Sequence, residues 1–260
     1  MQSDAWDRLF HKTLFLDETS TPLEYSRIEV EQFFEPVASF LVDKNKLTSR
    51  IMTVVAGPPG SGKSAFAVLL SALLNEMAEG RISVVIGLDG WHFPNAYLDS
   101  HMINRDGESV PLRRIKGSPE TFNTEAALTC LSQTRAGGQV PFPIYSRVKH
   151  DSIEAAGLVE NRHKIVIVEG NYWMLNEDPW RRFQPLFDVR IFITGNPEMF
   201  INGLVERHVR GGRSPEDARS YVEAVDALNI QRVLKNCVPA DITVHKTDSR
   251  RIDHIEWSVD

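Results

Sequence analysis

The chain has 260 residues, of which 42% are hydrophobic and 25% are charged. This composition provides enough apolar side chains for a sizeable core and excludes a chain that is disordered along its whole length. The formal net charge of −6 argues against nucleic acid or an anionic membrane surface as the main partner.

Cysteine content and hydropathy predict the cellular environment. Cys130 and Cys237 have neither paired nor metal-ligand spacing, which is typical of a reducing compartment. No apolar run approaches the roughly 20 residues of a membrane span, and the first residues lack the basic start and apolar stretch of a signal peptide. We therefore expect a cytoplasmic protein that acts on small molecules, without a membrane or nucleic-acid partner; a homodimer remains open.

Residues 1–48 are expected to form a mostly helical appendage that precedes a main domain of residues 49–260. A short amphipathic helix is indicated by the spacing of Trp6, Phe10 and Leu14. A stronger helical stripe runs from Val30 to Leu41, and Pro36 is expected to end or kink it. The favoured interpretation is a helix packed on the flank of the core.

The sequence of residues 57–64 is GPPGSGKS, which fits the phosphate-binding pattern G-x-x-x-x-G-K-[ST]. An apolar, β-branched run at 51–56 predicts a strand before it, and an apolar helical period over 64–77 predicts a helix after it. A glycine loop between strand and helix presents backbone N–H groups and the positive end of the helix dipole to phosphate. The expected nucleotide site comprises Gly57, Pro58, Pro59, Gly60, Ser61, Gly62, Lys63, Ser64 and Ala65, with Lys63 on the β- and γ-phosphates and the Ser64 hydroxyl on Mg²⁺.

A second strand is predicted at 82–88, and it is followed by Asp89 and His92. Ligands bind beyond the carboxyl ends of parallel strands, so both residues should lie near the nucleotide. Asp89 there could accept a proton from a substrate hydroxyl or hold Mg²⁺ through water. Its spacing alone is equally compatible with a turn-capping Asp-Gly pair, and His92 taken alone is more typical of a structural histidine.

Residues 94–118 form a long, polar, basic segment with the features of a loop. Its cations either bind an anionic substrate or form a solvated face. Asn123 is expected to cap a helix over 124–134, and two prolines favour an extended segment at 140–145. Hydroxyl, cationic and imidazole groups follow closely at 146–151.

Four aliphatic residues at 165–168 predict a buried strand that ends in Glu169. This pattern is similar to a Walker B strand, whose terminal acid orients Mg²⁺ or its water. A helical excursion is expected over 173–186 and a fourth strand over 189–194.

A helix over 197–208 ends in a cluster of arginines around Gly211 and Gly212. Arg207 and Arg210 suit a lid over a transferring phosphoryl group, because guanidinium groups bind phosphate oxygens in pairs. The alternative is an ordinary solvated helix end, where the helix dipole favours cations. Ser214 is expected to cap a further helix that reaches about 235, a fifth strand is predicted at 240–244, and the tail at 252–257 is a candidate edge strand.

Five further motifs occur in the order LDGWHF at 88–93, KGSPETF at 116–122, YSRVKHD at 145–151, VEGNY at 168–172 and DALN at 226–229. Together with the phosphate loop, they resemble the P-loop kinases of the phosphoribulokinase, uridine kinase and bacterial pantothenate kinase group, and especially its YggC-like branch of fructose-transport-system kinases. The resemblance spans about residues 50–245.

The resemblance implies an α/β three-layer sandwich with a five-stranded parallel sheet, an Arg-rich lid, and ATP with Mg²⁺ on the loop. It implies that Asp89 is the general base, that Glu169 with Ser64 holds the metal, and that Lys63, Arg207 and Arg210 stabilise the transferring group. An acceptor pocket is implied around His92, Lys116, Tyr145, Arg147 and His150.

The sequence thus predicts an ATP-dependent kinase that phosphorylates a hydroxyl of a small metabolite, with a sugar or polyol acid favoured by the basic residues. An ATP-binding sensor without kinase activity is the alternative, and Asp89 beside the loop argues against it because a sensor needs no hydroxyl-directed base. The lack of an N-K-x-D-like guanine motif argues against a GTP-switch NTPase.

Overall fold

A computed structural model describes residues 8–10, 13–15, 22–105, 107–248 and 251–258. Trp6 lies outside these residues, so they include only Phe10 and Leu14 of the pattern expected for a short N-terminal helix. Within the described chain, no helix combines the length and apolar character needed to cross a membrane.

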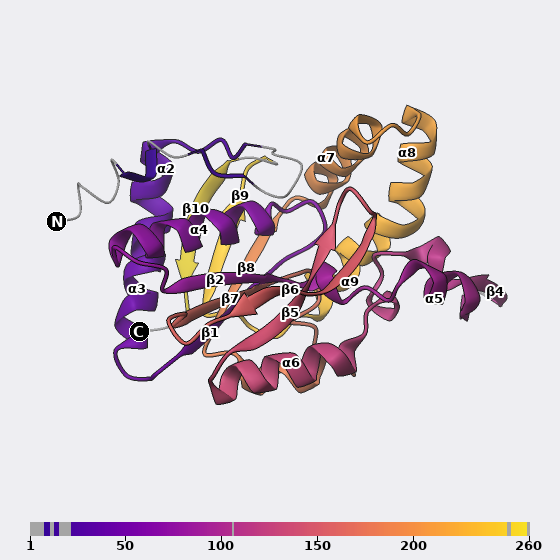
Figure 1. Ribbon diagram of the computed structural model, residues 1–260. Coiled ribbons are helices and arrows are strands. Elements are labelled where there is room, and N and C mark those ends of the chain that lie inside the picture. Colours follow the sequence, from indigo (N-terminus) through magenta and orange to yellow (C-terminus); the bar gives the residue numbers. More distant parts are fainter. Residues whose placement is uncertain (1–7, 11–12, 16–21, 106, 249–250, 259–260) are drawn as a thin grey trace.

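The centre of the molecule is a six-stranded sheet in the order β10-β9-β8-β1-β7-β2 (Figure 1). Five of its strands are parallel, as predicted: β1 (Ile51–Ala56), β2 (Ser83–Gly87), β7 (Ile165–Glu169), β8 (Val189–Gly195) and β9 (Ile242–Lys246). The sixth, β10 (Ile252–Trp257), adds to β9 in the antiparallel direction and confirms the expected edge strand. The sheet therefore has six strands rather than five.

Alternate residues of β1, β2, β7 and β8 enter two different cores, one on each face of the sheet, which makes the three layers. On β1, Ile51 and Val55 face a core shared with α3 (Glu35–Asn45) and α4 (Lys63–Met77). Met52 and Val54 face the opposite core, shared with α6 (Thr124–Ala136), the 3-10 helix η5 (Trp180–Leu186) and α9 (Ala227–Asn236). Every residue of β1 is buried, which explains its unbroken apolar sequence.

The N-terminal stripe forms one continuous helical segment made of α2 (Arg27–Glu29), a π-helical turn (Val30–Phe34) and α3. Pro36 does not end the helix: it follows the π-helical turn and occupies the first turn of α3, where its missing N–H is tolerated. Phe34 packs on Phe66 of α4 at 4.7 Å between ring centroids. The segment thus shares the main core, and the domain boundary near residue 48 stays a prediction.

The basic segment at 94–118 is not the long loop that its polarity predicted. It contains α5 (Asn95–Ser100), the hairpin of β3 (Met102–Arg105) and β4 (Glu108–Pro111), and a 3-10 helix, η3 (Leu112–Ile115). A small apolar cluster of Leu98, Leu112 and Ile115 holds these elements together. These elements are too short to produce a clear helical or strand periodicity in the sequence.

A second hairpin pairs β5 (Val140–Ser146) with β6 (Asp151–Val159). The extended character of β5 was predicted, whereas β6, which is rich in small and polar residues, was missed. The motif at 145–151 is the turn of this hairpin. The excursion at 173–186 was predicted to be helical throughout, but only η5 is helical.

Two helices form the expected lid region, and Figure 1 shows them projecting beyond the sheet. They are α7 (Pro197–Arg210) and α8 (Pro215–Tyr221), and α8 continues through a π-helical turn (Val222–Asp226) into α9. Asn196 caps α7 and Ser214 caps α8, each through a side-chain oxygen. Phe200, Leu204, Val222 and Ile230 form a separate small core in this region.

Candidate active site

The phosphate loop connects β1 to α4 at the carboxyl edge of the sheet. Gly62 caps α4 with a left-handed φ of 84°, which L side chains rarely adopt. Gly60 has a φ of 80°, and a Cβ built on it would lie 3.0 Å from Cγ of Leu204 on α7. Glycine at this position therefore also lets the lid helix approach the loop.

The predicted loop lysine is held inside the loop. Lys63 is 9% exposed, and its Nζ donates to the Pro58 carbonyl at 3.3 Å. Burial lowers its pKa, while the neighbouring carboxylates of Glu169 and Asp89 act in the opposite direction. Both acids that were expected at the site are therefore within electrostatic reach of the lysine.

Ser64 and Glu169, the predicted metal ligands, are in direct contact. Strands β1 and β7 are neighbours in the sheet, with Val55 paired to Glu169, so the acid at the end of β7 lies beside the loop that follows β1. The Ser64 hydroxyl donates to Glu169 Oε1 at 3.1 Å. Burial raises the pKa of Glu169, and the charge of Lys63 partly offsets this effect.

The Ser64 hydroxyl and the Glu169 carboxylate suit a Mg²⁺ ion that binds together with the phosphates of a nucleotide. Mg²⁺ prefers oxygen ligands and is usually held by one or two carboxylates together with substrate phosphates and water. No cluster of three or more His, Cys, Asp or Glu side chains in the described chain could hold a metal. The donor set therefore suits a cation shared with a bound nucleotide better than a metal held by the protein alone.

Asp89 lies in the 3-10 turn η2 (Leu88–Trp91) directly after β2, which is next to β7 in the sheet. Its carboxyl keeps 45% of its surface exposed and lies 3.5 Å from Nη2 of Arg147. Burial raises the pKa of Asp89, but the electrostatic effect of His92 and the charges of Arg147 and Lys63 outweigh it and hold the pKa below its usual value. Asp89 is thus a carboxylate at neutral pH.

His92 has a structural contact and one unused nitrogen. Its Nδ1 lies 3.0 Å from the Asp89 carbonyl oxygen and 3.8 Å from Asp89 Oδ1, while its ring packs 4.0 Å from that of Phe122. Burial lowers the pKa of His92, so the imidazole is neutral at pH 7. Its Nε2 is buried and has no hydrogen-bond partner among the described residues.

Lys116 joins three of the elements around Asp89. Its Nζ donates to Asn95 Oδ1 at 2.8 Å, to the Tyr145 hydroxyl at 3.2 Å and to the His150 carbonyl at 3.0 Å. Burial lowers the pKa of Lys116, with a further contribution from Arg113. His150 takes part through its backbone, and its imidazole is exposed. The structure thus brings Lys116, Tyr145 and Arg147 together, while the side chain of His150 is exposed.

The two lid arginines differ in position. Arg207 is close enough to Lys63 and Asp89 for its charge to act on the pKa of both groups. Arg210, one turn later on α7, contributes to lowering the pKa of Arg207, and the side chains of both arginines are exposed. Arg207 therefore belongs to the charged cluster, while Arg210 lies at its margin.

Sequence reasoning missed the residues that connect the lid to the acceptor side. The Tyr221 hydroxyl donates to the Lys116 carbonyl at 2.9 Å, and Asn229 Nδ2 donates to Ser118 Oγ at 3.3 Å. Within the lid region, His208 Nε2 lies 3.2 Å from Asp226 Oδ2. The motifs at 116–122 and 226–229 were recognised, but nothing in their spacing indicated that they contact each other. Asn95, which also binds Lys116, had no sequence signal.

Comparisons with known proteins agree with this geometry. Residues 52–252 match the model of the phosphoribulokinase / uridine kinase family. The uncharacterised protein YggC of Escherichia coli (strain K12) is 30% identical over 230 residues, which cover 88% of this chain and 92% of that one. The pantothenate kinase of Brucella ovis is 26% identical over 263 residues, which cover 90% of this chain and 79% of that one.

A solved structure from Silicibacter sp. TM1040, provisionally named as a fructose transport system kinase, superposes with a TM-score of 0.72 at 26% identity. The match covers 82% of this chain and 98% of that one. The family model spans more than half of the chain and includes the phosphate loop, Asp89, Glu169 and the lid. The chain therefore belongs to the phosphoribulokinase/uridine kinase family of P-loop kinases.

Proposed function

We propose that this protein transfers the γ-phosphoryl group of ATP to a hydroxyl of a small metabolite, with a sugar or a polyol acid as the acceptor class. The observation that carries the proposal is the position of Asp89, a carboxylate at neutral pH, within electrostatic reach of the loop lysine Lys63. A carboxylate directed at a hydroxyl beside a phosphate-binding lysine is what phosphoryl transfer requires.

In this proposal, the chain contributes position and charge. Backbone N–H groups of residues 57–65 bind the phosphates, and Lys63 and Arg207 neutralise charge on the transferring group. Bound Mg²⁺, with ligands Ser64 and Glu169, would supply further charge neutralisation. Arg210 reaches this group when the lid closes. Asp89 orients the hydroxyl of the metabolite and accepts its proton.

The side chains around Asp89 favour a substrate that is polyhydroxylated or anionic. Lys116 and Arg147 are cationic, Tyr145 offers a hydroxyl and an aromatic face, and the buried Nε2 of His92 is unpaired among the described residues. His150 would bind only if its exposed imidazole turned inward. The name of one relative, a pantothenate kinase, points to an acceptor that carries both hydroxyl and carboxylate groups.

The test is ADP production with Mg·ATP against a panel of sugars, sugar acids, glycerate, pantothenate and nucleosides. We expect one acceptor class to stimulate ADP release, and Lys63→Ala to abolish the stimulation. If the wild-type protein binds ATP but no hydroxyl compound of these classes raises ADP release, the proposed activity is wrong and a nucleotide-sensing role replaces it.

A further inference from the structure

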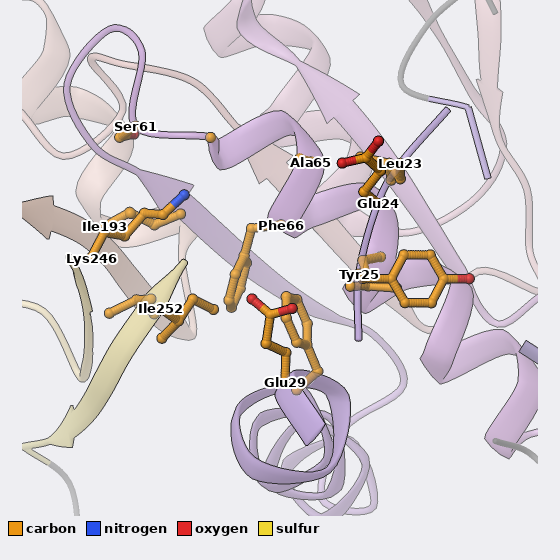
Figure 2. A pocket seen from close by; sticks show the side chains of 14 residues that line it. Leu23, Glu24, Tyr25, Glu29, Ser61, Ala65, Phe66, Ile193, Lys246 and Ile252 are labelled. Carbon is orange, nitrogen blue, oxygen red and sulfur yellow. The ribbon is translucent and has the colours of Figure 1, made fainter. Parts of the chain in front are cut away.

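A pocket lies beside the phosphate loop on the side away from Asp89. It encloses about 490 Å³ of space, part of which is open to solvent. It is lined by Gly62, which caps α4, by Ala65 and Phe66 of that helix, and by Ile193 of β8. Figure 2 shows Ala65, Phe66 and Ile193 around it.

The order of the strands shows on which side of the phosphate loop the pocket lies, relative to Asp89 and Glu169. The loop follows β1, and the acids Glu169 and Asp89 follow β7 and β2 on one side of it. The pocket is lined by residues of β8, β9 and β10, on the other side. A nucleotide whose γ-phosphate faces Asp89 must therefore extend its α-phosphate and nucleoside towards the pocket.

The chemistry of the lining suits the nucleoside. Phe66, Ile193 and Val244 give an apolar surface for a base. Figure 2 shows Glu29 and Lys246 on opposite sides of Phe66. Burial lowers the pKa of Lys246, and the charges of Asp248 and Glu29 partly offset this effect. Glu29 and Lys246 offer an acceptor and a donor to the polar edge of a base or to a ribose.

An independent observation also points to a ligand here. Ser61 lines the pocket, is 0% exposed, and its Oγ has no hydrogen-bond partner within the described residues. Buried hydroxyl groups are rarely left unpaired, because removing an unpaired polar group from water is unfavourable. A ligand hydroxyl or phosphate oxygen in the pocket would satisfy it.

One wall of the pocket comes from outside the family match, which begins at residue 52. Leu23, Glu24 and Tyr25 lie along this wall, and Glu29 follows in the first turn of the N-terminal helix. The backbone N–H of Leu23 donates to the Leu14 carbonyl at 2.8 Å and the Tyr25 hydroxyl donates to the Leu9 carbonyl at 3.1 Å, so the wall is held by the N-terminal region itself.

We infer that residues 23–29 form part of the nucleotide site of this protein and contact the nucleoside half of the phosphoryl donor. The N-terminal region thus selects a nucleoside triphosphate over a bare polyphosphate. This inference rests on the proposed function, because it takes the direction of the triphosphate from the position of Asp89.

The test compares the binding of Mg·AMP-PNP, a non-hydrolysable ATP analogue, with that of Mg·tripolyphosphate, which has no nucleoside, by titration calorimetry. Leu23→Trp places a larger side chain in the pocket wall, and Leu47→Trp adds the same ring at a site of the N-terminal region that is 83% exposed. We expect Leu23→Trp to weaken AMP-PNP binding by about tenfold or more and tripolyphosphate binding by less than about twofold. Leu47→Trp should change neither.

A measurement on the wild-type protein keeps the inference testable if Leu23→Trp does not fold. AMP-PNP should slow amide hydrogen exchange in residues 22–29, whereas tripolyphosphate should not. Equal effects of both ligands, or none in this segment, would overturn the inference while leaving the phosphate site intact. If the wild-type protein binds neither ligand, the proposed function fails, and this inference fails with it.

Discussion

At the scale of single residues, the site depends on which groups carry charge at neutral pH. Asp89 is ionised because its cationic neighbours outweigh its partial burial, and His92 beside it is neutral because it is buried. A carboxylate is the form that the proposed proton acceptor needs at physiological pH, and Asp89 is in this form.

The first prediction concerns Asp89→Asn. The amide preserves the size of the side chain but cannot accept a proton, so kcat should fall by about 10²–10⁴-fold. The Kd for Mg·AMP-PNP should change by less than about threefold, since the phosphates are bound by the loop. Asp99→Asn, an exposed position on the nearby helix α5, is the matched control and should retain wild-type turnover. Loss of nucleotide binding in Asp89→Asn would instead indicate a metal-binding or structural role.

A second prediction concerns Glu169 and pH. Because burial raises the pKa of Glu169 above its ordinary value of 4.5, the folded chain binds this proton more tightly than the unfolded chain does. The contribution of Glu169 to the free energy of unfolding is therefore greatest below pH 4.5, and it is lost as the pH rises through the pKa of Glu169 in the folded protein. Glu169→Gln has no such titration and keeps an oxygen for Ser64.

Thermal unfolding of the two proteins without nucleotide, measured from pH 4 to pH 8, checks this sign. The Tm of the wild type should fall relative to that of Glu169→Gln as the pH rises. A difference that stays constant, or that changes in the opposite direction, would show that Glu169 is not destabilised as a buried carboxylate.

At the scale of elements, the site depends on how the β5–β6 hairpin lies against the turn that carries Asp89 and His92. A Cβ added at Gly90 would lie 2.2 Å from the Pro143 carbonyl oxygen, so only glycine permits this approach. The same hairpin carries Tyr145 and Arg147. The contact therefore sets the spacing between Asp89 and its cationic neighbour.

Gly90→Ala should accordingly reduce both stability and turnover. The clash with backbone should cost about 1–3 kcal/mol of the free energy of unfolding, as in other overpacked sites, and separation of Arg147 from Asp89 should lower kcat. Urea denaturation measures the first effect. Gly80→Ala, where the nearest atom is 3.8 Å away, is the control and should unfold at nearly the wild-type urea concentration. Equal midpoints for both variants would contradict the contact.

The sequence predicted the elements whose signals are local. β1, α4, β7 and β8 are long and strongly apolar, and their caps, glycines and terminal acids lie at fixed offsets. β6 and the β3–β4 hairpin were missed because they pair as two-stranded hairpins outside the main sheet, so their faces carry no clear apolar alternation. Their pairing is decided by tertiary contacts rather than by propensity.

At the scale of the whole molecule, the residues that could not be predicted are those that join distant segments. The contact of Tyr221 with the Lys116 carbonyl spans 105 positions of the chain, and that of Asn229 with Ser118 spans 111. No local pattern encodes such partners. The same applies to the wall at residues 23–29, which packs beside the phosphate loop only because the N-terminal helix shares a core with α4.

These long-range contacts link the three parts on which the account depends: the phosphate loop, the acceptor side and the lid. Tyr221 and Asn229 connect the lid region to the segment that carries Lys116, and Gly60 lets α7 approach the loop. The lid region therefore contacts both the phosphate loop and the segment that carries Lys116. Such contacts suit the proposed transfer between two bound molecules, for which water must be kept away from the phosphoryl group.

The most direct test of the central claim follows the γ-phosphate itself. The protein is incubated with Mg·ATP labelled with ³²P in the γ position and with the compound that most stimulates ADP release, and the labelled products are separated. The account predicts that the label appears in an organic phosphate ester, in equal amount to the ADP formed, and that Asp89→Asn strongly reduces both. Label found only in inorganic phosphate, at a rate independent of any hydroxyl compound, would contradict it.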